Sequence, residues 1–369
     1  MTSAYIHIPF CASKCFYCSF VVAVGAENKA DEYIAAVLKE AEQYTGQGLC
    51  SLYFGGGTPS FLSAVQWEKL LGGLLKKFSL QAGAEVTVEC NPESICDDEK
   101  LAVFKEHGIN RISLGVQTMD ERFLKYLGRN HDANGARNAY HFIRKHSISN
   151  VSLDFMYGFP GQSIREIELD LAEIAALKPE HVSLYTLDIE PRSRFHARRV
   201  AVSQRQQAEY YACVNRMLES LGFQHYEISN YARPGYASRH NSHYWRGGNY
   251  FGLGVGAHGH CDGRRYWNTD RLADYMALIA SGKPALQGEE LLDSRQRFDE
   301  AFLFGLRMEE GIDLGGLSAK FGEGLSEEQC CRLDEFEKAG YIEKKGAAVR
   351  LTFTGKLVLD ELCVKLLRV

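Results

Sequence analysis

Cys11-Ala-Ser-Lys-Cys15-Phe-Tyr-Cys18 is the stretch from which we read the rest of this chain, and it directly follows Tyr5-Ile-His-Ile-Pro-Phe10. Its three thiols have the spacing C-x3-C-x2-C. Three thiolates on one short loop can hold three irons of a [4Fe–4S] cluster, which normally takes four such ligands, so one iron stays open. A zinc site, which more often shows two C-x-x-C pairs or added histidines, and three cysteines without a shared role are the alternatives.

The bulk composition is that of an ordinary globular protein. The 369 residues favour two domains, and the net charge of -5 gives no reason to expect a nucleic-acid partner. The 11 cysteines are an odd number, which favours a reducing cytoplasm over a secreted disulfide framework. We expect no signal peptide and no membrane span, because neither a basic and then apolar start nor a run of about eighteen apolar residues occurs. Contact with a membrane surface is left open.

Short apolar strands and helical patterns alternate over the first two thirds of the chain. The expected strands are Tyr5–Ile8, Ser51–Phe54, Glu85–Glu89, Arg111–Val116, Val151–Tyr157 and His181–Leu187. The expected helices lie around Tyr33–Ala41 and Trp67–Leu75, after Asp97, and over Glu121–Leu127, Ala133–Lys145, Ile164–Leu177 and Gln204–Leu221. Repeated βα units predict a parallel sheet, and six strands predict a partial (β/α)6 TIM-like barrel, with a doubly wound open sheet as the alternative.

Polar and glycine residues recur where the expected strands end. The cysteine loop follows the first strand, Gly55-Gly-Gly-Thr-Pro59 the second, and Glu89 ends the third. The fourth strand leads to Gln117, and the fifth contains Asp154. Because the chemistry of a βα barrel lies at the carboxyl ends of its strands, these residues predict one common site.

The last 139 residues differ in composition from the expected barrel. Residues 231–290 are rich in Gly, Tyr, His and Trp, and we expect irregular strands and loops that close one side of the barrel. Residues 291–369 predict a small helical domain in which a helix, a two-stranded ribbon and a helix form a winged-helix-like unit. We therefore divide the chain into residues 1–230, 231–290 and 291–369. The charges of the last part are mixed, without the basic stripe of a nucleic-acid-binding module.

The cysteine motif, with Tyr17 before its third cysteine, resembles the signature of the radical S-adenosylmethionine (SAM) enzymes. The resemblance implies that the open iron chelates the amino and carboxylate groups of SAM, and that a reduced cluster passes an electron to the sulfonium, which can yield a 5'-deoxyadenosyl radical. It also implies that Gly56, Gly57 and Thr58 meet the SAM amino group. Glu89 is a carboxylate that needs a partner if buried, and the ribose or amine of SAM would serve.

Further motifs are similar to those of the oxygen-independent coproporphyrinogen III oxidase family, a narrower group within the superfamily. They are Tyr5-x-His-Ile-Pro-Phe-Cys11, Ile112–Gln117, Leu127–His131 and Asp154–Gln162, and the similarity covers nearly the whole chain. The match implies that the SAM pocket is lined by Tyr5, Tyr17, Gln117, Arg129, Asp154 and also His258. The guanidinium of Arg129 suits a carboxylate, since it is a bidentate donor.

Two departures separate this chain from the oxidases of that family. Those oxidases carry a further cysteine where this chain has Phe20. They also have a long extension ahead of the cluster motif, whereas ten residues precede Cys11 here. Both departures resemble the HemW branch of oxidase-like haem chaperones. His240-Asn-Ser-His243-Tyr-Trp245 matches the haem-binding motif of that branch, which implies that His240 ligates haem iron, with His243 as the weaker substitute.

The resemblance therefore implies a haem chaperone with a SAM-coordinated [4Fe–4S] cluster that delivers haem to haem-requiring respiratory proteins. A radical SAM oxidase that decarboxylates coproporphyrinogen III is the alternative, and a nucleic-acid modifier ranks third. His258, His260 and Cys261 raise a second metal site as a further alternative. The sequence leaves open which proteins receive haem, whether the chain forms a homodimer, and whether SAM is cleaved in turnover.

Overall fold

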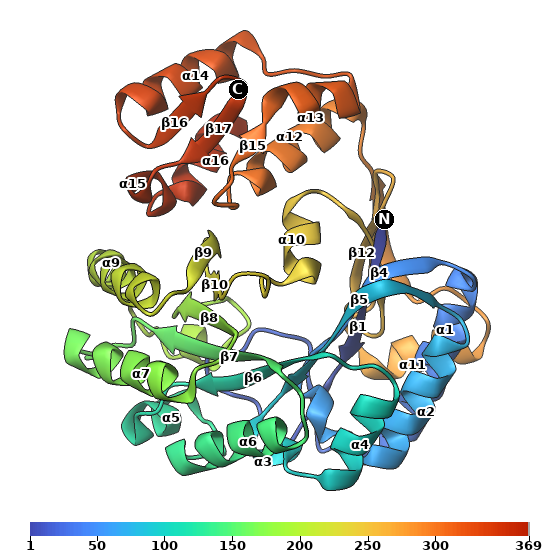
Figure 1. Ribbon diagram of the computed structural model, residues 1–369. Coiled ribbons are helices and arrows are strands. Elements are labelled where there is room, and N and C mark those ends of the chain that lie inside the picture. Colours follow the sequence, from blue (N-terminus) through green and yellow to red (C-terminus); the bar gives the residue numbers. More distant parts are fainter. Residues whose placement is uncertain (368–369) are drawn as a thin grey trace.

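One twelve-stranded sheet organises the first 291 residues of the computed structural model, which describes residues 1–367 (Figure 1). In order across the sheet the strands are β14 (Leu286–Leu291), β13 (Arg264–Asn268), β12 (His258–Cys261), β11 (Asn249–Leu253), β1 (Thr2–Ile8), β4 (Gly48–Gly56), β5 (Ser79–Cys90), β6 (Arg111–Gln117), β7 (Asn150–Tyr157), β8 (His181–Thr186), β10 (Asn230–Ala232) and β9 (Gln224–Glu227). Strands β11 through β8 run parallel, and the outer strands on both sides are antiparallel. This confirms the expected partial barrel.

Helices cover the outer face of the curved sheet (Figure 1). They are α1 (Ala30–Glu40), α2 (Ala64–Leu75), α4 (Asp98–Glu106), α5 (Glu121–Leu127), α6 (Ala133–Lys145), α7 (Ile164–Leu177), α9 (Gln204–Ser220) and α11 (Leu272–Ala280). Shorter elements are β2 (Phe10–Cys11), β3 (Ala23–Val24), η1 (Glu27–Lys29), η2 (Ala41–Tyr44), η3 (Pro59–Phe61), α3 (Pro92–Ile95) and α8 (Arg194–Ala197). All six expected strands and all seven expected helices are present, because each carries its own periodic apolar pattern.

The inner face of the parallel strands is polar. Apolar residues such as Leu52 and Val88 point to the helices and are fully buried in the main core. Tyr53, Glu89 and Ser113 point instead to the inner face, where they line a cavity. A TIM barrel usually fills its interior with layers of branched apolar side chains. The polar lining found here keeps a cavity open instead.

Residues 231–290 are more regular than we expected. They add β11 to the parallel set beside β1, extend the sheet with β12 to β14, and form the helices α10 (Arg239–Trp245) and α11. The sequence signal for β11 is weak, since Gly252 interrupts its apolar pattern and Gly254 follows it directly. Gly252 is needed there, because a Cβ atom would lie 1.9 Å from the carbonyl oxygen of His258 on the neighbouring strand.

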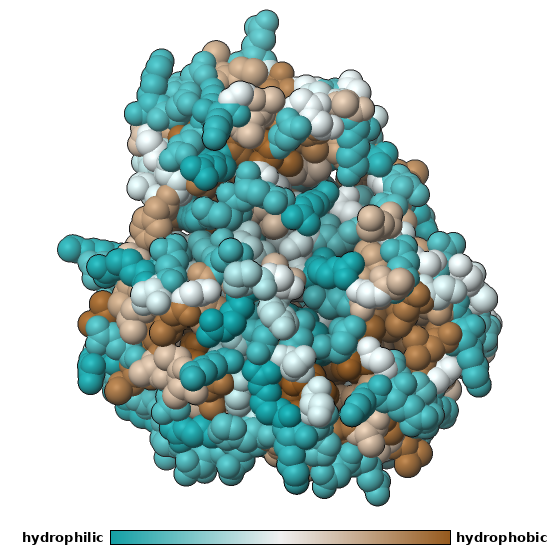
Figure 2. Space-filling view, viewed as in Figure 1, coloured by the Kyte–Doolittle hydropathy of each residue, from teal (hydrophilic) through white to brown (hydrophobic). Residues whose placement is uncertain are grey.

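The C-terminal residues form a unit with its own apolar core. It contains α12 (Ser294–Gly305), β15 (Ile312–Asp313), α13 (Leu314–Phe321), α14 (Glu327–Lys338), β16 (Ile342–Lys345), β17 (Ala348–Leu351), α15 (Phe353–Lys356) and α16 (Leu359–Leu367). The expected ribbon is β16–β17, and the two-residue strand β15 pairs with β17 as a third member. The face in Figure 2 is mostly hydrophilic, and within residues 1–367 no helix is long and apolar enough to cross a bilayer.

The N-terminus of α10 is held against β5 by one buried carboxylate. Glu85 is 6% exposed and accepts hydrogen bonds from the backbone amides of Arg239 and His240, both at 3.0 Å, and from the Ser238 hydroxyl at 3.2 Å. A negative charge at a helix N-terminus also interacts favourably with the helix dipole. Glu85 thus fixes where α10 lies above the inner face of the sheet.

We predict that Glu85→Gln lowers the free energy of unfolding by about 1–3 kcal/mol, because charge-assisted hydrogen bonds to the buried carboxylate are lost. Urea unfolding followed by circular dichroism measures the change. Glu328→Gln on the exposed face of α14 is the matched control and should change the free energy by less than about 0.5 kcal/mol. Equal stability of the two variants would contradict the anchoring role of Glu85.

Candidate functional site

A cavity of about 620 Å³ opens at the carboxyl ends of the parallel strands. It brings together eleven of the residues singled out from the sequence, which are Cys11, Cys15, Tyr17, Cys18, Gly56, Gly57, Thr58, Glu89, Gln117, Arg129 and Asp154. Tyr5 and His240 do not line it. Its volume is within the range of about 300–1,000 Å³ typical of small-molecule sites.

The cysteine loop is fixed to the barrel through Phe16. The Phe16 amide donates to the carbonyl of Leu127 at 2.9 Å, and its carbonyl accepts from the Phe195 amide at 2.9 Å. The Phe16 ring packs in a small apolar cluster with Phe195, and the guanidinium of Arg198 lies 4.8 Å from its centre. Cys15 and Tyr17, on either side of Phe16, are thereby directed to the cavity.

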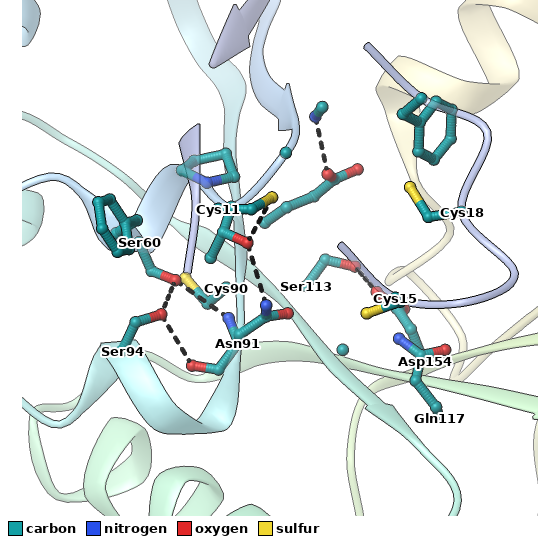
Figure 3. A pocket seen from close by; sticks show the side chains of 18 of the residues that line it. Cys11, Cys15, Cys18, Ser60, Cys90, Asn91, Ser94, Ser113, Gln117 and Asp154 are labelled. Carbon is teal, nitrogen blue, oxygen red and sulfur yellow. Dashed lines mark hydrogen bonds between the residues drawn. The ribbon is translucent and has the colours of Figure 1, made fainter. Parts of the chain in front are cut away.

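The three thiols surround the cavity without meeting at one point. In Figure 3, Cys15 and Cys18 lie on one side and Cys11 on the other, with the Cys11 Sγ 3.4 Å from the Thr58 Oγ1. Among residues 1–367, no three His, Cys, Asp or Glu side chains converge as ligands of a single metal ion. In a [4Fe–4S] cluster each thiolate binds a different iron, so such a cluster does not need three sulfurs that converge on one point.

The glycine-rich end of β4 lies directly against the start of the cysteine loop. The Gly57 amide donates to the carbonyl of Ile8 at 2.8 Å, and the Thr58 amide donates to that of Phe10 at 2.9 Å. A Cβ atom on Gly57 would lie 2.6 Å from the Pro9 carbonyl oxygen. Glycine is required at this position because the backbones of the two segments lie so close together. A ligand bound beside the cysteines would therefore also contact the end of β4.

Two carboxylates lie on the cavity wall. Glu89 accepts from the Tyr53 hydroxyl at 2.7 Å and from the Gly56 amide at 3.1 Å. Burial raises the pKa of Glu89 to about 7, although both hydrogen bonds favour the ionised form. Asp154 accepts from the hydroxyls of Ser113 at 2.7 Å and Ser152 at 2.9 Å, and burial raises its pKa as well. A cationic ligand would favour the ionised form of both.

Arg129 brings a positive charge to the same wall. Its guanidinium donates to the Gly115 carbonyl at 2.7 Å, to Asn91 Oδ1 at 2.9 Å, and to the Cys15 Sγ at 3.6 Å. Its buried Nε has no partner among residues 1–367. Gln117 has a φ of 68°, a left-handed conformation that is uncommon outside glycine and that occurs at ligand sites.

Tyr5 and His240 lie one layer behind the cavity, on either side of Tyr53. The ring centres of Tyr5 and His240 are 6.1 and 4.8 Å from that of Tyr53. His240 is 1% exposed, and its Nδ1 and Nε2 are each 2.8 Å from a hydroxyl, of Ser51 and Tyr244. His258, which the resemblance also assigns to the SAM pocket, is exposed on β12 and does not line this cavity.

Sequence reasoning missed several residues of the wall. Tyr53 and Ser113 lie inside strands, and Asn91 joins Thr58 Oγ1 (3.1 Å) to Arg129. Strands buried in a parallel sheet normally read as continuous apolar runs. The polar residues that alternate through β4, β6 and β7 were therefore a usable signal of a lined cavity.

Comparison with known proteins gives the family of the chain. Residues 5–174 match the family model described as Radical SAM superfamily, and residues 292–358 match the HemN C-terminal domain. Curated relatives named "Heme chaperone HemW" are 37% identical in Bacillus subtilis, covering 98% of each chain, and 34% identical in Escherichia coli, covering 98% of this chain and 96% of the relative. The crystal structure of coproporphyrinogen III oxidase (HemN) from Escherichia coli shares the fold, with a TM-score of 0.87 at 23% identity over 99% of this chain and 89% of that one.

We predict that Gly57→Ala prevents the cysteine loop from closing on β4 and lowers iron uptake during anaerobic reconstitution, with a loss of stability of about 1–3 kcal/mol from overpacking. Iron and sulfide analysis and thermal unfolding measure the two effects. Gly72→Ala in α2 is the control, since its Cβ would have no neighbour closer than 3.8 Å, and helix propensity predicts a gain of about 0.5–1 kcal/mol. Normal iron uptake by Gly57→Ala would contradict the role given to this contact.

Proposed function

The chain belongs to the radical SAM superfamily and, within it, to the family of heme chaperones HemW, and from this premise we propose that it binds haem and hands it to haem-requiring respiratory proteins. We further propose that it carries a [4Fe–4S] cluster on Cys11, Cys15 and Cys18, with SAM as the ligand of the open iron. The observation that carries the proposal is the cavity that joins these cysteines to glycine and carboxylate residues of β4, β5 and β7 and to Arg129, which follows α5.

The residues around the cavity suit the parts of SAM. A ligand can come close to the backbone of Gly56, Gly57 and Thr58. The Glu89 carboxylate can pair with an amine or accept hydrogen bonds from a ribose. Arg129 brings a guanidinium to the cavity wall, and that group suits a carboxylate. Gln117, Asp154 and Tyr17 complete the wall, and Tyr5 supports it from behind Tyr53. When bound, the cluster supplies one-electron chemistry, and the chain orients SAM and shields it from water.

His240 is our candidate for the iron ligand of haem. The Ser51 hydroxyl donates to Ser3 at 2.8 Å, so the proton between His240 and Ser51 belongs to the imidazole Nδ1. Nε2 then accepts from the Tyr244 hydroxyl. An imidazole with Nδ1–H fixed and Nε2 as acceptor is the usual form of a ligating histidine. The Tyr244 hydroxyl would have to leave Nε2 before that nitrogen could bind iron.

Other features support the proposal less directly. All 11 cysteines are free thiols, which agrees with the cytoplasm as the compartment. The part of the chain with its own core, 298–366, agrees with a C-terminal domain near residues 291–369, while residues 231–290 carry the haem motif on α10. Phe20, at the place of the additional oxidase cysteine, is 64% exposed and has no thiol to offer.

One anaerobic experiment tests the proposal. The reconstituted chain should contain about four irons and four sulfides per molecule, and its reduced EPR signal should change when SAM is added. Haem added to the same preparation should give a Soret band that His240→Ala weakens. With coproporphyrinogen III, SAM and a reductant, no vinyl product should appear. A chain that takes up no haem would refute the chaperone assignment, and vinyl products would favour the oxidase.

We predict that the affinity for SAM depends on pH through Glu89. A carboxyl with a pKa of about 7 is mostly protonated at pH 6 and mostly ionised at pH 8, and only the ionised form pairs with a cation. Affinity should therefore rise by about tenfold from pH 6 to pH 8. Calorimetric titration of the cluster-loaded chain measures it, and Glu89→Gln should bind more weakly with a flatter profile. An unchanged slope in that variant would assign the titration to another group.

A further inference from the structure

A β-bulge interrupts β6 where this strand reaches the cavity. Gly115 pairs with Asp154 of β7, whereas Gln117 pairs with Phe155, the next residue of β7, so Val116 is an extra residue on β6. A bulge bends its strand locally and changes the direction of a side chain beside it. Gln117, which ends the strand in the left-handed conformation with a φ of 68°, is directed into the cavity.

The bulge brings the Gln117 amide together with Asn91 and Arg129. A Cβ atom on Gly115 would lie 3.0 Å from Gln117 Nε2 and 3.1 Å from Asn91 Oδ1. The Nη2 of Arg129 is 3.5 Å from the same point. Glycine at position 115 thus leaves the room in which these three side chains meet, and all three line the cavity. The direction of the Gln117 amide therefore depends on the bulge.

Hydrogen bonds to Val116 fix the bulge on the side that precedes Gln117. The Val116 carbonyl accepts from the Thr118 amide at 2.9 Å and lies 3.1 Å from His131 Nε2. Since a carbonyl only accepts, Nε2 carries the proton of this imidazole. A left-handed backbone at a residue other than glycine costs free energy and persists only where the surrounding structure fixes it. The residues that follow Gln117 must therefore be held as well.

Asp170 on α7 holds the residues that follow Gln117. It is buried, with 7% of the residue exposed, and it does not line the cavity. Its Oδ2 accepts from the Thr118 hydroxyl and its Oδ1 from the Met119 amide, both at 2.7 Å. Burial raises the pKa of Asp170 to about 7, although both hydrogen bonds favour the ionised form. Both oxygens of one carboxylate are thus bonded to two consecutive residues.

We propose that Asp170 is a positioning residue for SAM: from behind the cavity wall, it holds the bulge of β6 so that the Gln117 side chain meets the ligand. The proposal rests on SAM binding as part of the proposed function. An asparagine at this position has one acceptor oxygen, and its NH2 group would face the Thr118 hydroxyl or the Met119 amide. Because a buried donor without an acceptor is unfavourable, the backbone after Gln117 would shift to relieve it.

Calorimetric titration of the cluster-loaded chain with SAM tests this role at pH 8, where a carboxyl with a pKa of about 7 is mostly ionised. Asp170→Asn should bind SAM about fivefold to tenfold more weakly. Gln117→Gly removes the side chain and accepts the left-handed conformation. In that background Asp170→Asn should weaken binding by less than about twofold, because the two residues act as one unit.

Glu173→Gln is the matched control for the loss of a carboxylate. Glu173 lies on the same helix and pairs with Arg137 at 2.8 Å, away from the bulge. This variant should bind SAM as tightly as the unchanged chain. If Asp170→Asn does not fold, Thr118→Val, which removes one of the two donors to Asp170, takes its place in the same titrations.

The EPR spectrum separates positioning from a general loss of structure. Without SAM, reduced Asp170→Asn should give the signal and the iron content of the unchanged chain, since its carboxylate bonds to Thr118 and Met119 and not to the cysteine loop. The change in the signal on addition of SAM should require a higher SAM concentration.

Three results would overturn this inference alone. They are an unchanged SAM affinity in Asp170→Asn, an equal loss of affinity with and without the Gln117 side chain, and an equal loss in Glu173→Gln. If the unchanged chain takes up no cluster or binds no SAM, the proposed function fails together with this inference.

Discussion

The amides of Gly57 and Thr58 donate to the carbonyls of Ile8 and Phe10, and the rest of the site depends on this backbone contact. It joins the end of β4 to the start of the cysteine loop with no room for a side chain between them. From that junction Cys11 faces Thr58, and Glu89 on the next strand reaches the Gly56 amide. Three segments far apart in sequence thereby meet at one edge of the parallel sheet.

Much of the fold and of the cavity could be predicted from the sequence, because each barrel strand and helix carries a local periodic pattern and the functional residues follow the strand ends. The placement of Cys11, Glu89, Gln117 and Asp154 on one wall follows from that rule alone. The contact of Gly57 could not be predicted in this way. The sequence shows both Gly57 and Pro9, but only the structure shows that the backbone of Gly57 lies against the Pro9 carbonyl.

The features that escaped prediction depend on contacts between distant segments. Strand β11 pairs with β1 across more than 240 residues, and its glycines hide its pattern. The sequence shows that His240 belongs to a motif but not which groups surround it. Only the structure shows that both of its ring nitrogens form hydrogen bonds.

The aromatic row behind the cavity has a thermodynamic consequence. Tyr53 donates to Glu89 and stacks on His240, while His240 is bonded to Tyr244, whose ring centre is 4.3 Å from that of Tyr250 on β11. A ligand that shifts Tyr53 or Tyr244 acts on one continuous set of contacts. Any factor by which a ligand in contact with Tyr53 changes the affinity for a ligand in contact with Tyr244 must then operate equally in the reverse direction.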